Sequence, residues 1–144
     1  MNPALTIVER CIENSKGLFK ELEGEFYPFG FVRFHDGSVC PYYLKRENEF
    51  PDCDSLLKDL ISNLYLDINS KKFKEVATCA ITFRVFDNVH YDFLDIKIMT
   101  EEGIQKDYCV IIDPDYTSNT FEILETMEFN GTFAVIAKMN LQAE

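Results

Sequence analysis

The alternation of apolar and polar residues is clearest between Lys74 and Asp113, where it predicts three β-strands joined by short polar turns. Successive strand residues point to opposite faces, so apolar residues at every second position place one face of each strand in a core. These positions are Ala77, Cys79, Ile81, Phe83 and Val85, then Leu94, Ile96 and Ile98, then Tyr108, Val110 and Ile112. The connections are too short for a helical crossover, so the strands are expected to be antiparallel.

Helical spacing of apolar residues predicts two helices outside this meander. Asn2 and Pro3 suit the start of the first helix and Gly24 its end, while Asp52 or Asp54 suits the start of the second. The apolar stripes are Leu5, Val8, Ile12, Phe19 and Leu22 in the first helix, and Leu57, Leu60, Ile61, Leu64 and Ile68 in the second. A helix with one apolar face is a suitable cover for a sheet.

Two further hairpins are predicted from their turns, because Asp36-Gly37 and Asn130-Gly131 each separate two apolar runs. The resulting order of elements is α-β-β-α-β-β-β-β-β. We therefore expect one α+β domain over residues 1–144, with two helices packed on one face of a mostly antiparallel sheet of five to seven strands.

The composition limits the cellular compartments in which this domain is expected. No run of about 18 apolar residues is present, which argues against a membrane span. The first residues carry Glu9 and Glu13 and no basic segment, which argues against a signal peptide. The five cysteines are odd in number and contain no C-x-x-C pair. They are expected to be free thiols in a reducing cytoplasm.

The formal net charge of −11 is unevenly distributed. Between Asp107 and Ala137 there is no lysine or arginine, and the acidic residues there are Asp107, Asp113, Asp115, Glu122, Glu125 and Glu128. Such a surface repels nucleic acids and anionic membranes and attracts a basic partner. Solubility alone is the simpler explanation of the same charge.

The best catalytic-looking cluster is His35 with Asp36 and Cys40, since a thiolate nucleophile needs a nearby base and a group that orients it. However, turn chemistry explains Asp36-Gly37 fully, and a tight exposed turn offers no pocket. His90 lies beside a second turn and is expected to be a surface residue.

Motifs for the common enzyme classes are absent from the sequence. There is no G-x-G-x-x-G, P-loop, G-x-S-x-G or H-E-x-x-H. Asp113-Pro114-Asp115 lacks the spacing of a calcium loop and is expected to be a turn. With two histidines and scattered cysteines, neither a metal site nor a cofactor site is predicted, and no catalytic residue is assigned.

Aromatic residues are concentrated in the first hairpin. Tyrosine pairs an apolar ring with a polar tip and is a common interface anchor, although core packing is the alternative. The residues expected to bind a partner are Tyr27, Tyr42, Tyr43, Glu122, Glu125 and Glu128.

The run EFYPFG from Glu25 to Gly30, directly after the first predicted helix, resembles a group of small uncharacterised bacterial proteins with a helix, an F-Y-P-F-G hairpin, a second helix and a meander. The resemblance implies a bacterial cytosolic α+β protein, and it assigns no catalytic residue. Small acidic immunity proteins are similar in size and charge, and so are type III secretion chaperones.

The function expected from these observations is non-enzymatic protein binding, in its most concrete form as an immunity-like inhibitor of a basic partner. Two alternatives stay open. One is a small-molecule-binding or enzymatic domain of an unrecognised type. The other is a secretion-chaperone-like homodimer, formed through an open sheet edge or through the aromatic face.

Overall fold

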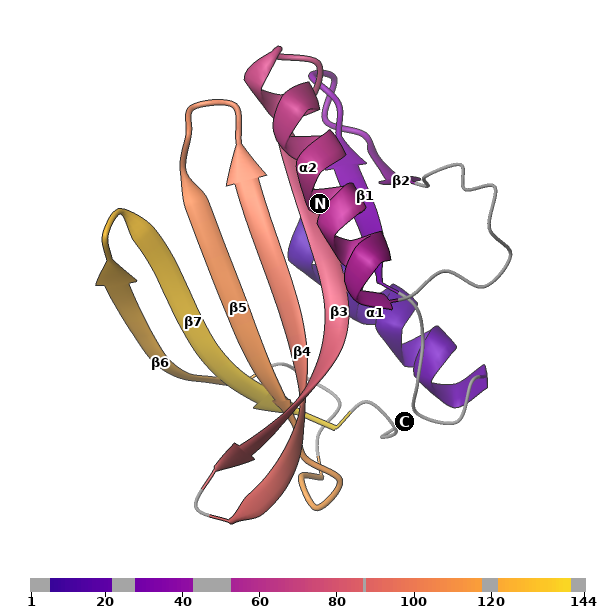
Figure 1. Cartoon of the computed structure of the whole chain (residues 1–144). Coiled ribbons are helices and arrows are strands. Elements are labelled where there is room, and N and C mark those ends of the chain that lie inside the picture. Colours follow the sequence, from indigo (N-terminus) through magenta and orange to yellow (C-terminus); the bar gives the residue numbers. More distant parts are fainter. Residues whose placement is uncertain (1–5, 22–27, 43–52, 87, 118–121, 141–144) are drawn as a thin grey trace, which may run out of the picture.

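The computed structural model describes residues 6–21, 28–42, 53–86, 88–117 and 122–140. Its elements in chain order are α1 (Ile7–Glu21), β1 (Phe29–Arg33), β2 (Val39–Tyr42), α2 (Cys53–Asn69), β3 (Glu75–Phe86), β4 (Val89–Thr100), β5 (Gln105–Ile112), β6 (Glu122–Phe129) and β7 (Thr132–Met139). Figure 1 shows a large twisted sheet accompanied by the two helices. The α+β class, the order of the elements and the final hairpin are confirmed.

The first helix begins at a capping box. The Thr6 hydroxyl accepts a 3.1 Å hydrogen bond from the backbone N–H of Glu9, and the Glu9 carboxylate accepts a 3.3 Å bond from the N–H of Thr6. The pair satisfies two backbone donors that a helix start leaves open. The described helix therefore starts later than predicted, with Thr6 as its cap. Asn2 and Gly24, its predicted limits, lie outside the described residues.

The second helix ends at Asn69. Lys71 then adopts a left-handed φ of 63°. The N–H of Lys71 donates to the carbonyl of Ile68, and the N–H of Lys72 donates to the carbonyl of Asp67, each over 3.1 Å. These two bonds form a Schellman motif, which satisfies carbonyls at the end of the helix and turns the chain into the sheet.

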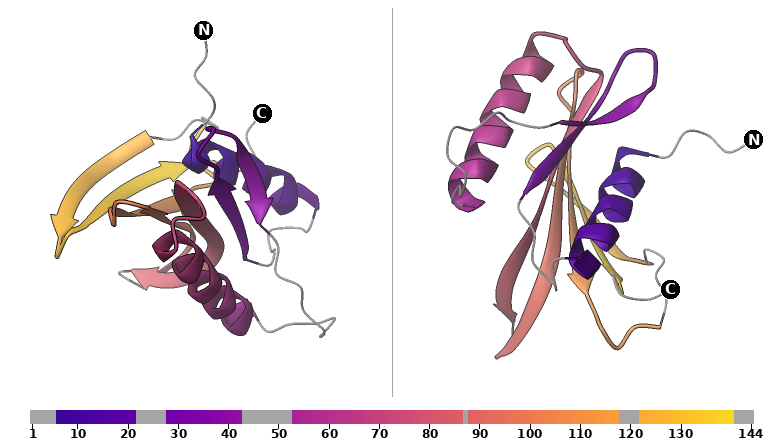
Figure 2. Two further views of the ribbon diagram at one scale, coloured as in Figure 1. Left: turned by 90° about the horizontal axis from the view of Figure 1, so that it is seen from above. Right: turned by 90° about the vertical axis from the view of Figure 1, so that its right-hand side faces the viewer.

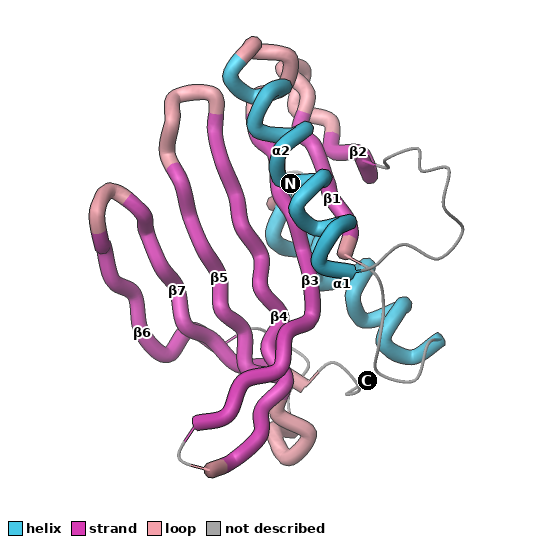
Figure 3. The backbone as a smooth tube through the Cα atoms, in the orientation of Figure 1, coloured by secondary structure: helices cyan, strands magenta, loops and turns pink. Residues whose placement is uncertain are grey.

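The sheet has the strand order β2-β1-β3-β4-β5-β7-β6. All neighbouring pairs are antiparallel except β5 and β7, which run parallel. The predicted antiparallel meander is thus confirmed as β3-β4-β5. The last hairpin returns with its second strand against the meander and its first strand at the edge, as the tube in Figure 3 shows.

The composition of the last two strands explains which of them occupies the edge. β7 buries Val135, Ala137 and Met139 on one face, and this face needs neighbours on both sides. β6 carries Glu122, Glu125 and Glu128, and it is exposed at every residue whose exposure is described. Charged strands suit edges, because an edge strand faces water.

The two helices lie on opposite sides of the sheet (Figure 2). On one side, which we term the α1 side, α1 packs on a core that includes Phe31 and Cys79. On the other, the α2 side, α2 places Leu64 in a second core with Val32 and Val76. The sheet is therefore the central layer of a helix–sheet–helix arrangement at this end of the molecule.

The expectation that both helices pack on one face is wrong, and the reason lies in β3. Every residue from Val76 to Ala80 is buried, so both faces of this strand lie in apolar surroundings. A strand buried on both faces needs a cover on each of them. The predicted apolar face of this strand contained Ala77 and Cys79. Val76 and Ala80 form a second apolar face on the opposite side, which the prediction left out.

Each helix covers only one end of the sheet. α1 contacts mainly β1 and β3, and α2 contacts the same two strands from the other side. Strands β5, β7 and β6 extend beyond both helices (Figures 1 and 2). On the α1 side the buried core nevertheless continues to Val110 of β5 and to Ala137 and Met139 of β7, so this face of β5, β7 and β6 is exposed only in part among the described residues.

The contact between α1 and β3 contains two buried thiols and one hydroxyl. Ser15 donates a 2.7 Å hydrogen bond to the carbonyl of Cys11, and its Oγ lies 3.4 Å from the Sγ of Cys79. A hydrogen bond to the Cys79 thiol, together with burial, raises the pKa of Cys11 well above its usual range. Cys40 and Cys109 are also free thiols. Cys11 is consequently a neutral packing residue in the folded protein.

Leu64 and Leu66 provide a matched test of how α2 sits on the sheet, because they lie two residues apart on one helix. Leu64 is 2% exposed and Leu66 is 70% exposed. We expect Leu64→Ala to lower the free energy of unfolding by about 2–5 kcal/mol, since it leaves a cavity. Leu66→Ala should change it by less than about 0.5 kcal/mol. Urea denaturation measures both, and equal losses would contradict the observed rotation of α2.

Candidate functional site

The α1 side of β5, β7 and β6 is covered only in part, because Val110, Ala137 and Met139 are buried there in the core beneath α1. We call the part of this face that carries exposed side chains the open half-sheet. Cross-strand partners point to the same face, so the register identifies its members. They are Lys106, Tyr108, Phe133, Val135, Ile123, Thr126 and Glu128, with Ile104 at the entry to β5. Phe133, Ile104 and Ile123 are large apolar residues exposed to solvent. The open half-sheet is therefore a partly apolar surface.

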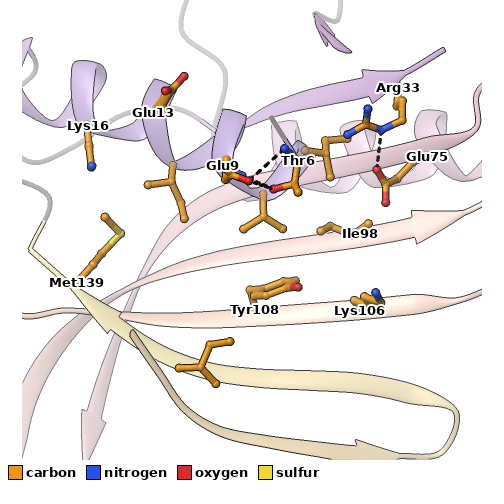
Figure 4. A pocket seen from close by; sticks show the side chains of 14 residues that line it. Thr6, Glu9, Glu13, Lys16, Arg33, Glu75, Ile98, Lys106, Tyr108 and Met139 are labelled. Atoms are coloured by element: carbon orange, nitrogen blue, oxygen red, sulfur yellow. Dashed lines mark hydrogen bonds and ion pairs between the residues drawn. The ribbon is translucent and has the colours of Figure 1, made fainter. Parts of the chain in front are cut away.

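A groove of about 700 Å³ separates α1 from the open half-sheet. Figure 4 shows the side chains of Ile98, Tyr108 and Met139 along the strands, with α1 above them. Ile7 and Ile12 contribute from the helix. A shallower hollow of about 610 Å³ shares Lys106 and Tyr108 with the groove and extends it onto β7 and β6. The two hollows therefore adjoin at Lys106 and Tyr108.

Three charged side chains at the rim of the groove, those of Arg33, Glu75 and Glu9, are engaged within the protein. The guanidinium of Arg33 forms a 3.2 Å ion pair with Glu75, and the Glu9 carboxylate accepts the helix-capping bonds from Thr6 (Figure 4). The register places Arg33 directly opposite Glu75 on neighbouring strands, which fixes this pair at one end of the groove. These groups hold the walls in place, and none of them forms a nucleophile–base pair.

Tyr108 is the most central polar side chain of the groove floor (Figure 4). Partial burial, and then the negative charge of Glu75, raise the pKa of its phenol. The phenol is accordingly neutral at physiological pH. A neutral phenol over an apolar floor offers a ring face and one hydrogen-bonding group to a bound molecule.

The β6–β7 hairpin exposes apolar side chains on both of its faces. The register shifts between Ile123 and Glu125, so Leu124 is an extra residue in a β-bulge. Ile123 faces the α1 side opposite Ala137, whereas Met127 faces the α2 side opposite Ala134. The exposed fractions of Ile123 and Met127 are 55% and 42%.

The bulge changes how the acidic residues of β6 are distributed. Glu122 and Glu125 face the α2 side, and Glu128 faces the α1 side. Glu122 lies 3.8 Å from the ammonium of Lys138 and accepts a hydrogen bond from the Tyr116 phenol, whose pKa this bond raises. Glu125 and Glu128 are exposed. The three predicted acidic residues thus lie on one edge strand, two on its α2 side and one on its α1 side.

The predicted tyrosines do not join this acidic strand. Tyr42 lies on β2, and its ring packs on Phe73 with centroids 6.4 Å apart. Burial, and next the charge of Asp67, raise the pKa of Tyr42. β2 and β6 are the two opposite edges of the sheet, roughly 29 Å apart along it at about 4.8 Å per strand. Tyr27 and Tyr43 lie outside the described residues.

The candidate cluster of His35, Asp36 and Cys40 is not assembled. The His35 ring is within 3.0 Å of the carbonyl of Lys71. The Asp36 carboxylate accepts bonds from the N–H and the hydroxyl of Ser38, which lower its pKa. Cys40 packs beside the α2-side core. Each residue therefore has a structural contact, and the turn explanation accounts for Asp36.

The other two candidates are turn or surface residues, as expected. His90 is exposed beside the β3–β4 turn. Asp113 accepts a 3.0 Å bond from the N–H of Asp115, and its carbonyl accepts a 3.2 Å bond from Tyr116, which is turn geometry. Among the described residues, no group of three or more His, Cys, Asp and Glu side chains has metal-binding geometry. No helix in that part of the chain has the length and hydrophobicity of a membrane span.

Sequence patterns alone missed the exposed apolar residues of the hairpin. The adjacent pair Ile123-Leu124 was the available signal, since two neighbouring apolar residues break a period of two. The groove was missed because its walls come from distant segments of the chain, including Val8, Tyr108 and Ile123.

Comparisons with protein-family models, with curated proteins and with solved structures give no match. The similarity of the Glu25–Gly30 run to small bacterial proteins stays a prediction, and residues 25–27 of it lie outside the described chain.

Tyr108 gives a pH test of the groove. Its pKa is raised above the ordinary value of 10.0, so at higher pH the folded protein retains a proton that the unfolded chain has lost. The free energy of unfolding should therefore fall as pH rises above about 10. Tyr108→Phe should make this fall shallower and remove one late-titrating phenolate from the absorbance at alkaline pH. Identical slopes for both proteins would show that Tyr108 titrates as an exposed tyrosine.

Proposed function

We propose that this chain is a non-enzymatic protein-binding module, with the β6–β7 hairpin and the adjoining open half-sheet as its contact surface. The observation that carries the proposal is the exposure of Ile123, Leu124, Met127 and Phe133 on one hairpin. Exposed apolar surface rimmed by polar residues is typical of interaction sites, and here it lies on both faces of one hairpin. It is costly to leave in water unless a partner covers it.

Charge supports a basic partner. The net charge is −11, and β6 contributes Glu122, Glu125 and Glu128 without any lysine or arginine. Complementary charge raises the rate of encounter and favours partners of opposite sign. An immunity-like inhibitor of a basic toxin is the most concrete form of this proposal, in keeping with the size and acidity of the chain.

Charge reversal on the hairpin tests the proposal. Glu125→Lys with Glu128→Lys should remove the electrostatic attraction and slow association with the partner at least tenfold at low salt. Glu122 is left unchanged, since it pairs with Lys138. The partner is first captured from the native lysate at low salt with the tagged protein and identified by mass spectrometry, and association rates are then measured with the purified pair.

The matched control carries the same change of charge away from the hairpin, as Glu21→Lys with Asp59→Lys on the two helices. It should retain most of the association rate. The proposal fails if no basic protein is captured, or if the hairpin and control variants associate equally fast.

A second function is favoured by one observation, the groove of about 700 Å³ beside α1, since small-molecule sites have about this volume. Its floor offers Ile98 and Met139 with the phenol of Tyr108. In this alternative the chain binds a small, largely apolar molecule that carries one hydrogen-bonding group.

Thermal denaturation with a panel of metabolites tests this alternative. A ligand that binds only the folded state raises the midpoint temperature by mass action. A variant that fills the groove, Val8→Phe, should abolish the shift, whereas Leu66→Ala on the far side of the sheet should leave it intact. The absence of any shift across the panel would argue against the small-molecule function.

A further inference from the structure

The two edges of the sheet differ in their capacity to accept another strand. β2 spans only Val39–Tyr42 and contains Pro41, which lacks a backbone donor. β6 spans Glu122–Phe129, contains no proline and has no strand beyond it among the described residues. A long edge without proline presents unpaired backbone groups that can pair with another chain.

The turn of the hairpin shows which backbone groups face outward. Asn130 and Gly131 have φ values of 50° and 80°, as in a two-residue type I′ turn. Such a turn is closed by a hydrogen-bonded pair, here Phe129 and Thr132, and bonded and non-bonded pairs then alternate. The backbone groups of Met127 consequently point toward β7. Those of the two residues beside it point away from the sheet.

These outward residues are Thr126 and Glu128, and they belong to the regular part of the edge. The bulge at Leu124 interrupts the ladder on one side, and the turn ends it on the other. The segment Glu125–Phe129 is therefore the part of β6 that can extend the sheet. Bulges commonly limit pairing in this way.

We propose that Glu125–Phe129 accepts an extended basic segment of the partner as an additional strand of the sheet. This inference rests on the proposed function and specifies its mode of binding. In strand addition, main-chain hydrogen bonds provide the affinity and alternate side chains provide the specificity. The added strand would pair with the backbone of Thr126 and Glu128 and cover exposed apolar side chains of the hairpin.

The side chains of β6 define the sequence that such a segment needs. Glu125 and Met127 face the α2 side, whereas Glu128 faces the α1 side. A strand paired antiparallel to β6 would therefore carry a basic residue opposite Glu128, an apolar residue opposite Met127 and a second basic residue opposite Glu125. The pattern is basic–apolar–x–basic, and directly opposed charges of opposite sign stabilise cross-strand pairs.

A second copy of this chain suits the edge less well. Pairing two β6 strands would bring together two sets of glutamates, with no lysine or arginine on either strand. Like charges on adjacent strands are destabilising. The charge of the edge thus favours a basic segment of another protein over a homodimer.

Synthetic peptides test the mode of binding directly. The probe is a twelve-residue peptide with three repeats of Arg-Val-Thr-Lys. One control peptide has Glu in place of Arg and Lys. The other controls carry N-methyl groups on alternate residues, so that each of them blocks one edge of the extended peptide. We expect binding of the basic peptide, with at least about tenfold weaker binding by the acidic peptide and by the N-methylated peptide that blocks the paired edge. The peptide should also slow hydrogen exchange of the amides of Thr126 and Glu128 at least about tenfold.

Two variants separate the contribution of the backbone hydrogen bonds to peptide affinity from the contribution of the side-chain charge. Thr126→Pro removes one outward donor and should weaken the basic peptide about tenfold at any salt concentration. Glu128→Gln keeps the donor and should weaken binding only at low salt. Urea denaturation confirms that each variant is folded before binding is compared.

Each result decides between the inference and the proposed function. Strand addition is overturned if the peptide does not bind. It is also overturned if the peptide binds without slowing hydrogen exchange at the amides of Thr126 and Glu128, and binds the Thr126→Pro variant equally well. If the association rate of a basic protein partner still depends on Glu125 and Glu128 in that case, the binding function stands and only the proposed mode of binding is wrong. Concentration-dependent dimerisation that protects the same two amides would instead identify a second copy as the occupant and overturn the inference.

Discussion

Burial of β3 on both of its faces is the constraint on which the rest of the structure depends. Residues from Val76 to Ala80 are removed from water on either side, and each side receives one helix. The chain has only two described helices, so both are used at the β1–β3 end of the sheet. Hydrophobic burial thus determines which strands receive a helix on both faces, while the exposed side chains of β5, β7 and β6 lie at the other end of the sheet.

The open half carries the features that favour recognition. The groove beside α1 is lined by apolar residues with Tyr108 at its centre, and the hairpin beyond it combines exposed Ile123 and Met127 with glutamates. The β-bulge at Leu124 places Ile123 on the α1 side and Glu122 on the α2 side, and both faces of β6 carry apolar and acidic groups. The binding function and its strand-addition mode both depend on this geometry of a single edge strand.

Local patterns predicted most of the elements, because periodicity and turn chemistry are properties of adjacent residues. The meander follows the period of two, and the Asn130-Gly131 turn has the positive φ values that its sequence suggests. The sequence did not predict the arrangement of distant segments. The side on which α2 packs depends on Val76 and Ala80, and the edge position of β6 depends on competition with β7 for the place beside β5.

The candidate site was predicted only in part for the same reason. Glu122, Glu125 and Glu128 do lie on one exposed strand, while Tyr42 lies at the other edge of the sheet. A pattern of residue types identifies surface chemistry, but it contains no information on which edges are neighbours. The exposure of Ile123 and Met127 follows from the edge position of β6, which is a property of the whole sheet.

Exposure of the hairpin in the free protein is the central claim, and solvent paramagnetic relaxation of methyl signals measures it most directly. With a soluble gadolinium chelate, we predict strong relaxation of the methyl groups of Ile123, Leu124 and Met127, and weak relaxation of those of Leu94 and Ile96. Weak relaxation of Ile123 and Met127 in dilute monomeric protein would contradict the account, because another part of the chain would then cover the surface assigned to the partner.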